Sequence, residues 1–203
     1  HILALASIGE GDIVAARNQC LETLSIAQEL GDERRLAMAH NGLGHLFRLE
    51  GNLDDAERSY RVAERLSRGV GDREMEGTVL LNLAMVAIGR SADSSAADML
   101  REVLAIAAAS GSRQMLQGAF EVAAGLAASR GDWEDAARLH GVAERHMQET
   151  GIRRDPADEA FLAPWIARTR AALGDDRFNA AEADGRSAQF APERDRLAAW
   201  VAG

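Results

Sequence analysis

Lysine is absent from the sequence, and all 23 basic residues are arginines. A Walker A phosphate loop needs a lysine that reaches the phosphates, and Schiff-base catalysis needs a lysine amine. Neither mechanism can therefore reside on this chain.

Cysteine and aromatic residues are scarce as well. Cys20 is the single cysteine, so no disulfide can form within the chain, and this usage fits a reducing compartment. Aromatic residues make up 4% of the sequence, which suits helices packed through small residues better than a sandwich of sheets. No run approaches the roughly 18 apolar residues of a membrane span, and no signal peptide is recognisable. We therefore expect a cytoplasmic protein without membrane association.

The formal charge of the chain is −9 at pH 7. Because nucleic acids are bound through phosphate contacts that need a basic face, we expect no direct nucleic-acid binding. A chain of 203 residues buries roughly 70% of its unfolded surface, which is enough for a stable domain without a disulfide or a metal ion.

A short glycine-led motif recurs at a fixed spacing. The stretch Gly51–Ala56 has counterparts that begin at Gly11 and Gly131, and a copy at Ser91 that has lost its glycine. The alanines that close the four copies stand forty residues apart: Ala16, Ala56, Ala96 and Ala136. A second set of glycines lies midway between the motifs: Gly31, Gly71, Gly111 and Gly151. A fixed period of this size is typical of a helical solenoid, in which each repeat stacks on its neighbours.

Each junction can end one helix and begin the next. Glycine readily adopts the left-handed conformation that follows a helix, and the Asp or Asn after it can cap the next helix. These junctions predict antiparallel helices over residues 32–50 and 52–70, each about 25 Å long. Since Ser91 replaces a glycine, we expect the most irregular junction there.

The predicted fold is all-α, a right-handed α-solenoid of helical hairpins with a helical C-terminal cap. Residues 1–151 form the repeats in this prediction, with the first repeat truncated and residues 1–10 as the end of an apolar helix. Residues 152–203 form capping helices of the same domain. Their predicted positions are Pro156 to Leu173, with a kink at Pro164, and shorter helices near 176–184 and 192–202.

The best-preserved repeat resembles the tetratricopeptide repeat (TPR). Its characteristic small, bulky and aromatic positions are filled by Leu43, Gly44, Phe47, Gly51, Ala56, Tyr60 and Ala63. The two later repeats match this pattern less closely. Because the period of forty exceeds the roughly 34 residues of the standard TPR, a HEAT-like repeat is an alternative.

The later part of the chain is similar to the C-terminal TPR-like region of actinobacterial MalT-like and LuxR-type transcriptional regulators and related STAND ATPase signalling proteins. The similarity is carried by residues 137–144, 150–151, 170–178 and 182–186. The chain departs from that pattern at Pro164, Arg194 and Arg196. The resemblance implies a sensor or interaction domain that accompanies an ATPase and a helix-turn-helix.

The same resemblance implies a binding groove on the concave side, which the first helix of each TPR lines. The groove residues that it indicates are Met38, Asn41, His45, Arg48, Thr78, Asn82, Met85 and Glu121. Methionine adapts to irregular apolar partners, and asparagine or arginine can bind a peptide backbone or a carboxylate. An ordinary solvated helix face is the alternative for each residue, and Asn82 could equally bond between helices.

No residue pattern indicates catalysis or a cofactor. His40 and His45, or His140 and Glu144, supply too few ligands for a zinc site, which needs three or four. His140 and Cys20 occupy equivalent packing positions of the repeats, so we expect both to be at least half-buried.

We therefore expect a non-catalytic regulatory module that binds a protein or peptide partner, or a small effector, without a metal or a cofactor. A plain self-association scaffold that forms a homo-oligomer is the main alternative. A helical enzyme domain is a further one.

Overall fold

A computed structural model describes residue 7 and residues 11–202 of the chain. The helix end predicted for residues 1–10 lies outside these residues, apart from Ser7. The regular structure of the described part is helical throughout, which confirms the predicted all-α class. The helices are α2 (Ile13–Leu30), α3 (Glu33–Leu49), α4 (Leu53–Gly69), α5 (Arg73–Gly89), α6 (Asp93–Ser110), α7 (Arg113–Arg130), α8 (Trp133–Thr150), α9 (Pro156–Leu173), α10 (Asp175–Ser187) and α11 (Phe190–Ala202).

The helices from α2 to α8 begin at intervals of twenty residues and are joined by turns of one geometry. At the turn between α3 and α4, Gly51 has a φ of 75°, and the Asn52 amide donates to the Phe47 carbonyl at 2.8 Å. The Asn52 side chain then accepts from the Asp55 amide at 3.2 Å and caps α4. At this junction the glycine ends one helix and the next residue caps the following one, as predicted. At the junction between α7 and α8, Asp132 makes no such side-chain bond.

Ser91 keeps the turn geometry without a glycine. Its φ is 58°, and the Ala92 amide donates to the Ala87 carbonyl at 2.9 Å, as in the turns at Gly31, Gly51, Gly71 and Gly131. In the turn at Gly111 the glycine amide itself donates to the Ala107 carbonyl instead. The backbone irregularity expected at this junction is therefore absent. The substitution instead costs stability, because a left-handed serine is strained and Ala92 offers no capping oxygen, a loss of about 1 kcal/mol for the cap.

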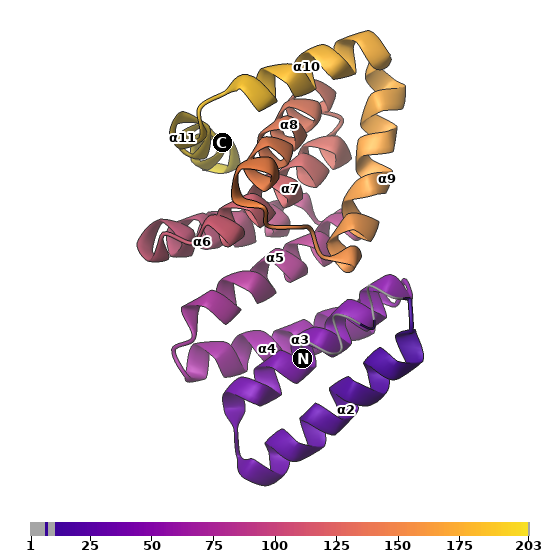
Figure 1. Cartoon of the computed structure of the whole chain (residues 1–203), viewed down its shortest axis with the longest axis vertical. Coiled ribbons are helices and arrows are strands. Elements are labelled where there is room, and N and C mark those ends of the chain that lie inside the picture. Colours follow the sequence, from indigo (N-terminus) through magenta and orange to yellow (C-terminus); the bar gives the residue numbers. More distant parts are fainter. Residues whose placement is uncertain (1–6, 8–10, 203) are drawn as a thin grey trace.

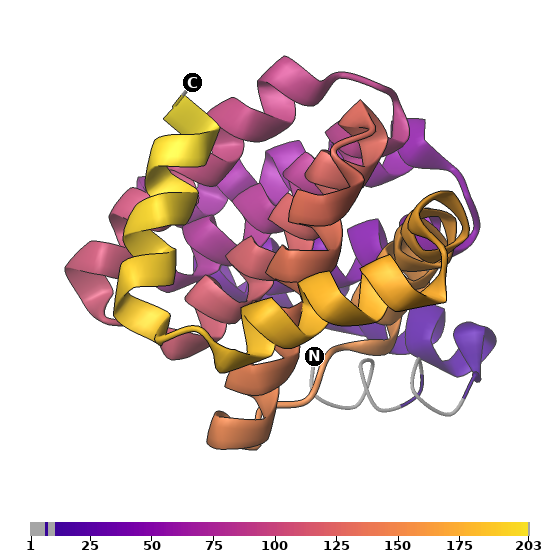
Figure 2. The same cartoon turned by 90° about the horizontal axis from the view of Figure 1, so that it is seen from above.

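The helices α2 to α8 are stacked one on the next along the long axis of the molecule, while α9 runs up one side of the stack (Figure 1). The start of α9 lies beside α3, and its length packs against α7 and α8. From above, α10 crosses the end of the stack, and α11 returns along its other side (Figure 2). The predicted α9 is confirmed as one helix that continues through Pro164, and α10 and α11 are longer than expected.

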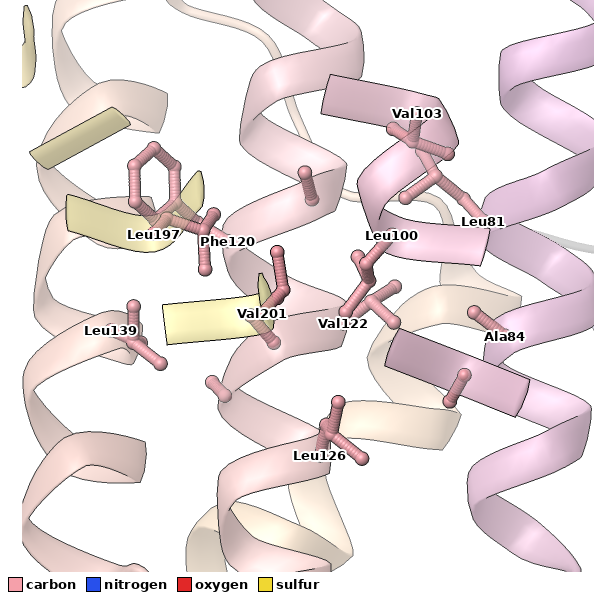
Figure 3. Packing of buried hydrophobic residues seen from close by; sticks show 14 of the residues in the cluster. Leu81, Ala84, Leu100, Val103, Phe120, Val122, Leu126, Leu139, Leu197 and Val201 are labelled. Atoms are coloured by element: carbon pink, nitrogen blue, oxygen red, sulfur yellow. The ribbon is translucent and has the colours of Figure 1, made fainter. Parts of the chain in front are cut away.

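Small residues set the distance between paired helices. The four alanines that recur every forty residues, Ala16, Ala56, Ala96 and Ala136, are all completely buried. A side chain on Gly44 would overlap the ring of Tyr60, so only glycine lets α3 approach α4 there. Leu197 and Val201 of α11 share the main core with side chains of α5 to α8 (Figure 3).

Within the described residues, no helix is sufficiently long and apolar to cross a membrane. Cys20 is buried and His140 is half-buried, as their positions in the repeats predict.

Candidate functional site

A pocket of about 370 Å³ lies between α3, α5, α7 and the segment 152–158, which leads into α9. Five of the eight predicted groove residues line it: Asn41, His45, Thr78, Asn82 and Glu121. Part of the lining comes from corresponding positions of the repeats, since Asn41, Leu81 and Glu121 stand forty residues apart and all line the pocket. The repeat therefore contributes to the pocket wall, and residues 152–158 complete it.

Arg48 and Met85 lie beside the pocket, although neither lines it. The Arg48 guanidinium, whose side chain is 7% exposed, donates to the Ala157 carbonyl at 2.9 Å and to Asp158 at 2.6 Å. It also donates to the Tyr60 hydroxyl at 3.3 Å and contacts the buried sulfur of Met85 at 3.0 Å. Arg48 therefore holds the start of α9 against α3 instead of presenting its donors to a ligand.

Met38 is half-buried on α3 and is not part of the pocket lining. Seven of the eight predicted residues are thus gathered at or next to one cavity, and Met38 stands apart from them.

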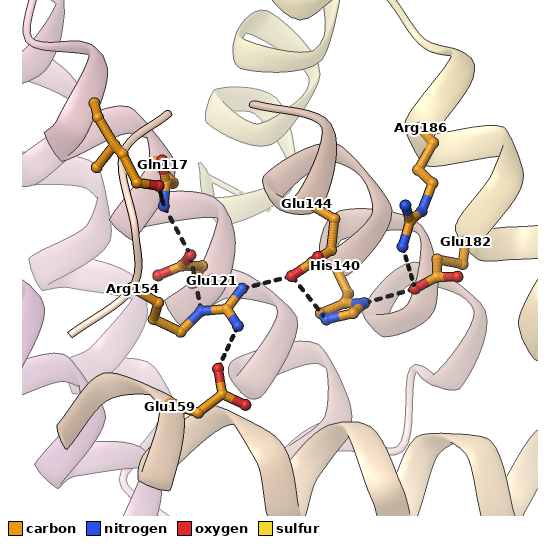
Figure 4. A network of polar contacts seen from close by, with 9 residues as sticks. Gln117, Glu121, His140, Glu144, Arg154, Glu159, Glu182 and Arg186 are labelled. Carbon is orange, nitrogen blue, oxygen red and sulfur yellow. Dashed lines mark hydrogen bonds and ion pairs between the residues drawn. The ribbon is translucent and has the colours of Figure 1, made fainter. Parts of the chain in front are cut away.

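Arg154 holds the segment 152–158, which borders the pocket, against the neighbouring helices (Figure 4). Its guanidinium contacts Glu121 of α7 at 3.0 Å, Glu144 of α8 at 2.8 Å and Glu159 of α9 at 2.5 Å. One buried cation thus joins three helices. Charge-assisted bonds of this kind fix geometry more tightly than neutral ones.

The polar network extends from Arg154 to the C-terminal helices (Figure 4). Glu144 lies 3.5 Å from His140, and the other ring nitrogen of His140 lies 3.1 Å from Glu182 of α10. Burial lowers the pKa of His140, while the neighbouring carboxylates act in the opposite direction. The network therefore connects the pocket wall with α10 through side chains in direct contact.

His45 lies between the Asn41 amide and the Arg48 guanidinium in the pocket lining. Its Nε2 lies 3.2 Å from the Asn41 amide nitrogen, and its Nδ1 lies 3.2 Å from an Arg48 nitrogen. Both neighbouring nitrogens belong to donors, because the Asn41 oxygen already accepts from the Asn82 side-chain nitrogen at 3.0 Å and Arg48 can only donate. A neutral imidazole keeps one acceptor nitrogen and a protonated imidazole keeps none, so these donors disfavour the charged ring.

We expect His45 to make the fold sensitive to acid. Burial, followed by the charge of Arg48, lowers its pKa from 6.5 to about 4, so the unfolded chain binds this proton at a higher pH than the folded one. The stability that neutral His45 contributes is complete above pH 6.5 and is lost as the pH falls toward 4, by at most roughly 3 kcal/mol. Urea unfolding from pH 7 to 4 measures this slope.

The variant His45→Gln should flatten the slope, since it removes the titrating ring. The same change at His40, which is less buried, is expected to alter the slope less. An unchanged slope in His45→Gln would show that other groups cause the acid sensitivity.

Glu121 and Gln117 form the inner wall on α7, and both are buried. Burial raises the pKa of Glu121 to about 6, while Arg154 opposes this shift. The Gln117 side-chain nitrogen donates to Glu121 at 3.2 Å and reaches the Ile152 carbonyl at 3.5 Å. Its oxygen is buried and has no hydrogen-bond partner in the part of the chain that the structure describes.

The sequence did not predict that residues 152–158 border the pocket. Asp155 and Pro156 were recognisable as a helix start, and Asp155 does accept from the Ala157 amide at 2.8 Å. The adjacent residues Arg153 and Arg154 did not indicate which carboxylates Arg154 would contact. One of them, Glu121, lies more than thirty residues earlier in the chain. Gln117 lacked any local signal as well.

No group of three or more His, Cys, Asp or Glu side chains that could hold a metal ion occurs in the part of the chain that the structure describes. A comparison with protein-family models finds no match to this chain, and a comparison with curated proteins finds none either.

Proposed function

We propose that this chain is a regulatory binding module, built as a right-handed α-solenoid of TPR-like hairpins with a helical C-terminal cap, that binds a small effector in the pocket beneath residues 152–158. The proposal is carried by one observation: five of the eight expected groove residues line a single cavity of about 370 Å³. Pockets of roughly 300–1,000 Å³ are typical of small-molecule sites.

A small effector is favoured over a long peptide because the chain itself occupies the neighbouring surface. The helix α9 lies against α3, α7 and α8, where a bound peptide would have to run. Arg48 and Arg154 attach its start through buried ion pairs. A peptide would have to displace α9, whereas a small ligand would not.

We further propose that the module is the sensor domain of a bacterial transcriptional regulator of the MalT-like or LuxR type, or of a related STAND ATPase. The twenty-residue spacing of α2 to α8 and the residues that resemble this group support the assignment. A bound effector would shift the equilibrium of the attached switch through its different affinity for the two states. A phosphate-loop lysine upstream and a helix-turn-helix downstream would support this placement, and the lack of both would overturn it.

Ligand binding in the pocket is testable by thermal unfolding with a panel of small amines, carboxylates, sugars and nucleotides. We expect at least one class to raise the midpoint by several degrees, since a ligand that binds only the folded state stabilises it. Thr78 is exposed at the pocket, and Thr78→Trp should fill the entrance and abolish the shift.

Thr23→Trp on α2 is the matched control, because both hydroxyls donate to the carbonyl four residues earlier. It lies away from the pocket and should leave the ligand-induced shift intact. A shift that survives Thr78→Trp, or a panel without any shift, would contradict the proposal.

A self-association scaffold is the second candidate, and the exposed apolar surface of α2 favours it. Val14 is 71% exposed and Leu30 is 66% exposed, and Leu21 and Ile26 lie on the same helix. Exposed apolar patches commonly mark protein interfaces. Concentration-dependent sedimentation without any ligand-induced thermal shift would favour this reading.

A further inference from the structure

The inner wall of the pocket offers acceptors that the chain leaves unused. The Gln117 nitrogen faces two acceptors, Glu121 and the Ile152 carbonyl, which fixes the orientation of the amide and directs its oxygen away from both. That oxygen is buried and has no hydrogen-bond partner among the described residues. Unsatisfied buried acceptors are rare in folded proteins and cost about 1–3 kcal/mol each, so the Gln117 amide gains stability if its side chain turns toward a donor in the cavity.

Glu121 adds a second free acceptor beside Gln117. Its Oε1 accepts from both the Gln117 nitrogen at 3.2 Å and the Arg154 Nε at 3.0 Å. Its Oε2 forms no hydrogen bond with any other described residue. The carboxylate can therefore accept from a ligand without releasing Arg154.

Carboxylates outnumber guanidinium groups in the pocket lining, although Arg48 beside the pocket is paired with one of them, Asp158. The lining includes four carboxylates, at Glu74, Glu121, Asp155 and Asp158, and two guanidinium groups, at Arg153 and Arg154. Arg154 is already shared among three carboxylates, two of them, Glu144 and Glu159, outside the lining. The excess of carboxylates would repel an anionic ligand.

Asp155 is a half-buried carboxylate of the lining. It accepts from the Ala157 amide and takes part in no ion pair among the described residues. Burial, and then the charge of Asp158, raise its pKa. A positive group next to Asp155 would stabilise its ionised form and offset the repulsion from Asp158.

The pocket lining also has an apolar part. Met75 and Leu81 of α5 and Met115 of α7 contribute to it, and the methionine side chains can adapt to an irregular alkyl group. An amphiphilic ligand with one charged end would match both the carboxylates and the apolar side chains.

We infer that the pocket binds a small organic cation, an ammonium or guanidinium group on a short alkyl chain. The cation lies between Glu121 and Asp155, and the alkyl part lies against Met75 and Met115. This inference rests on the proposed function, because it names the ligand class of the same pocket.

Titration calorimetry of the whole chain with four probes built on a four-carbon chain tests the inference: butylammonium, agmatine, butanol and butyrate. We expect the two cations to bind at least tenfold more tightly than the neutral and anionic probes. Nα-acetyl-lysinamide carries its ammonium on a peptide unit and should bind more weakly than butylammonium. Tighter binding of the acetyl-lysinamide would overturn the small-molecule assignment in favour of a partner's lysine side chain.

The variant Asp155→Asn removes the charge and keeps an oxygen that can cap α9, so the fold should be retained. We expect it to weaken butylammonium binding at least tenfold. Asp12→Asn is the matched control, since Asp12 caps α2 by accepting from the Ala15 amide, far from the pocket. It should leave the affinity unchanged.

The outcomes separate the inference from the proposed function. Equal affinity for butanol and butylammonium, or unchanged affinity in Asp155→Asn, would overturn the inference. If another ligand class raises the midpoint in a Thr78-dependent way while the amines do not bind, the proposed function stands and the inference fails. If no class binds, both fail.

Discussion

Replacement of Arg154 by methionine is expected to lower the free energy of unfolding by about 3–5 kcal/mol. The Arg154 side chain is 9% exposed and is the shared partner of Glu121, Glu144 and Glu159. Without it, Glu121 and Glu144 stay largely buried and close to each other with no compensating charge. The loss reflects these stranded carboxylates more than the net strength of the ion pairs, because Glu159 is 54% exposed and can be solvated.

Urea unfolding at pH 7, followed by circular dichroism, measures the effect. Arg153→Met is the matched control, since Arg153 is exposed and forms no ion pair in the described part of the chain. It should change the stability by less than about 0.5 kcal/mol. Addition of Glu121→Gln to Arg154→Met should restore part of the loss, because it removes one stranded charge. A loss below about 1 kcal/mol in Arg154→Met would contradict the structural role given to this residue.

The periodic part of the molecule was predictable because its causes are local. Gly51 and Asn52 determine one turn through two adjacent residues, and copies of this pair predict the other turns. The alanine at every fortieth position is buried at each copy, because a small residue is needed where the paired helices approach each other. Where the pattern was broken, at Ser91, the flanking helices enforced the turn, so tertiary packing overrode a poor local sequence.

The position of α9 was not predictable, although its ends were. The proline at its start and the glycine after Leu173 are local signals, and they gave the helix its bounds. Its docking depends on Arg48 and Asp158, which are 110 residues apart in the chain. No periodicity relates such a pair. Because the docking of α9 could not be foreseen, the sequence analysis predicted Arg48 in an open groove, whereas in the fold α9 covers it.

Replacement of Gly141 by alanine is expected to destabilise the chain by about 3 kcal/mol, because it forces α8 and α10 apart. A Cβ atom on Gly141 would overlap the carbonyl oxygen of Glu182, and one on Gly185 would overlap that of Arg138. Backbone atoms cannot rotate away as a flexible side chain can, so the cost should lie at the upper end of the roughly 1–3 kcal/mol typical of overpacking. Thermal and urea unfolding measure it.

The two glycines face each other across one helix crossing, and this makes their effects interdependent. Once Gly141→Ala has separated the helices, the overlap at Gly185 is partly relieved, so the double variant should lose less than the sum of the two single losses. Gly69→Ala is the control, since its nearest neighbour is a Glu33 oxygen at 4.0 Å and alanine favours a helix. It should retain or slightly increase the stability. Strict additivity would mean that the two glycines act at separate places, contrary to the close crossing of α8 and α10 that also brings Glu182 to His140.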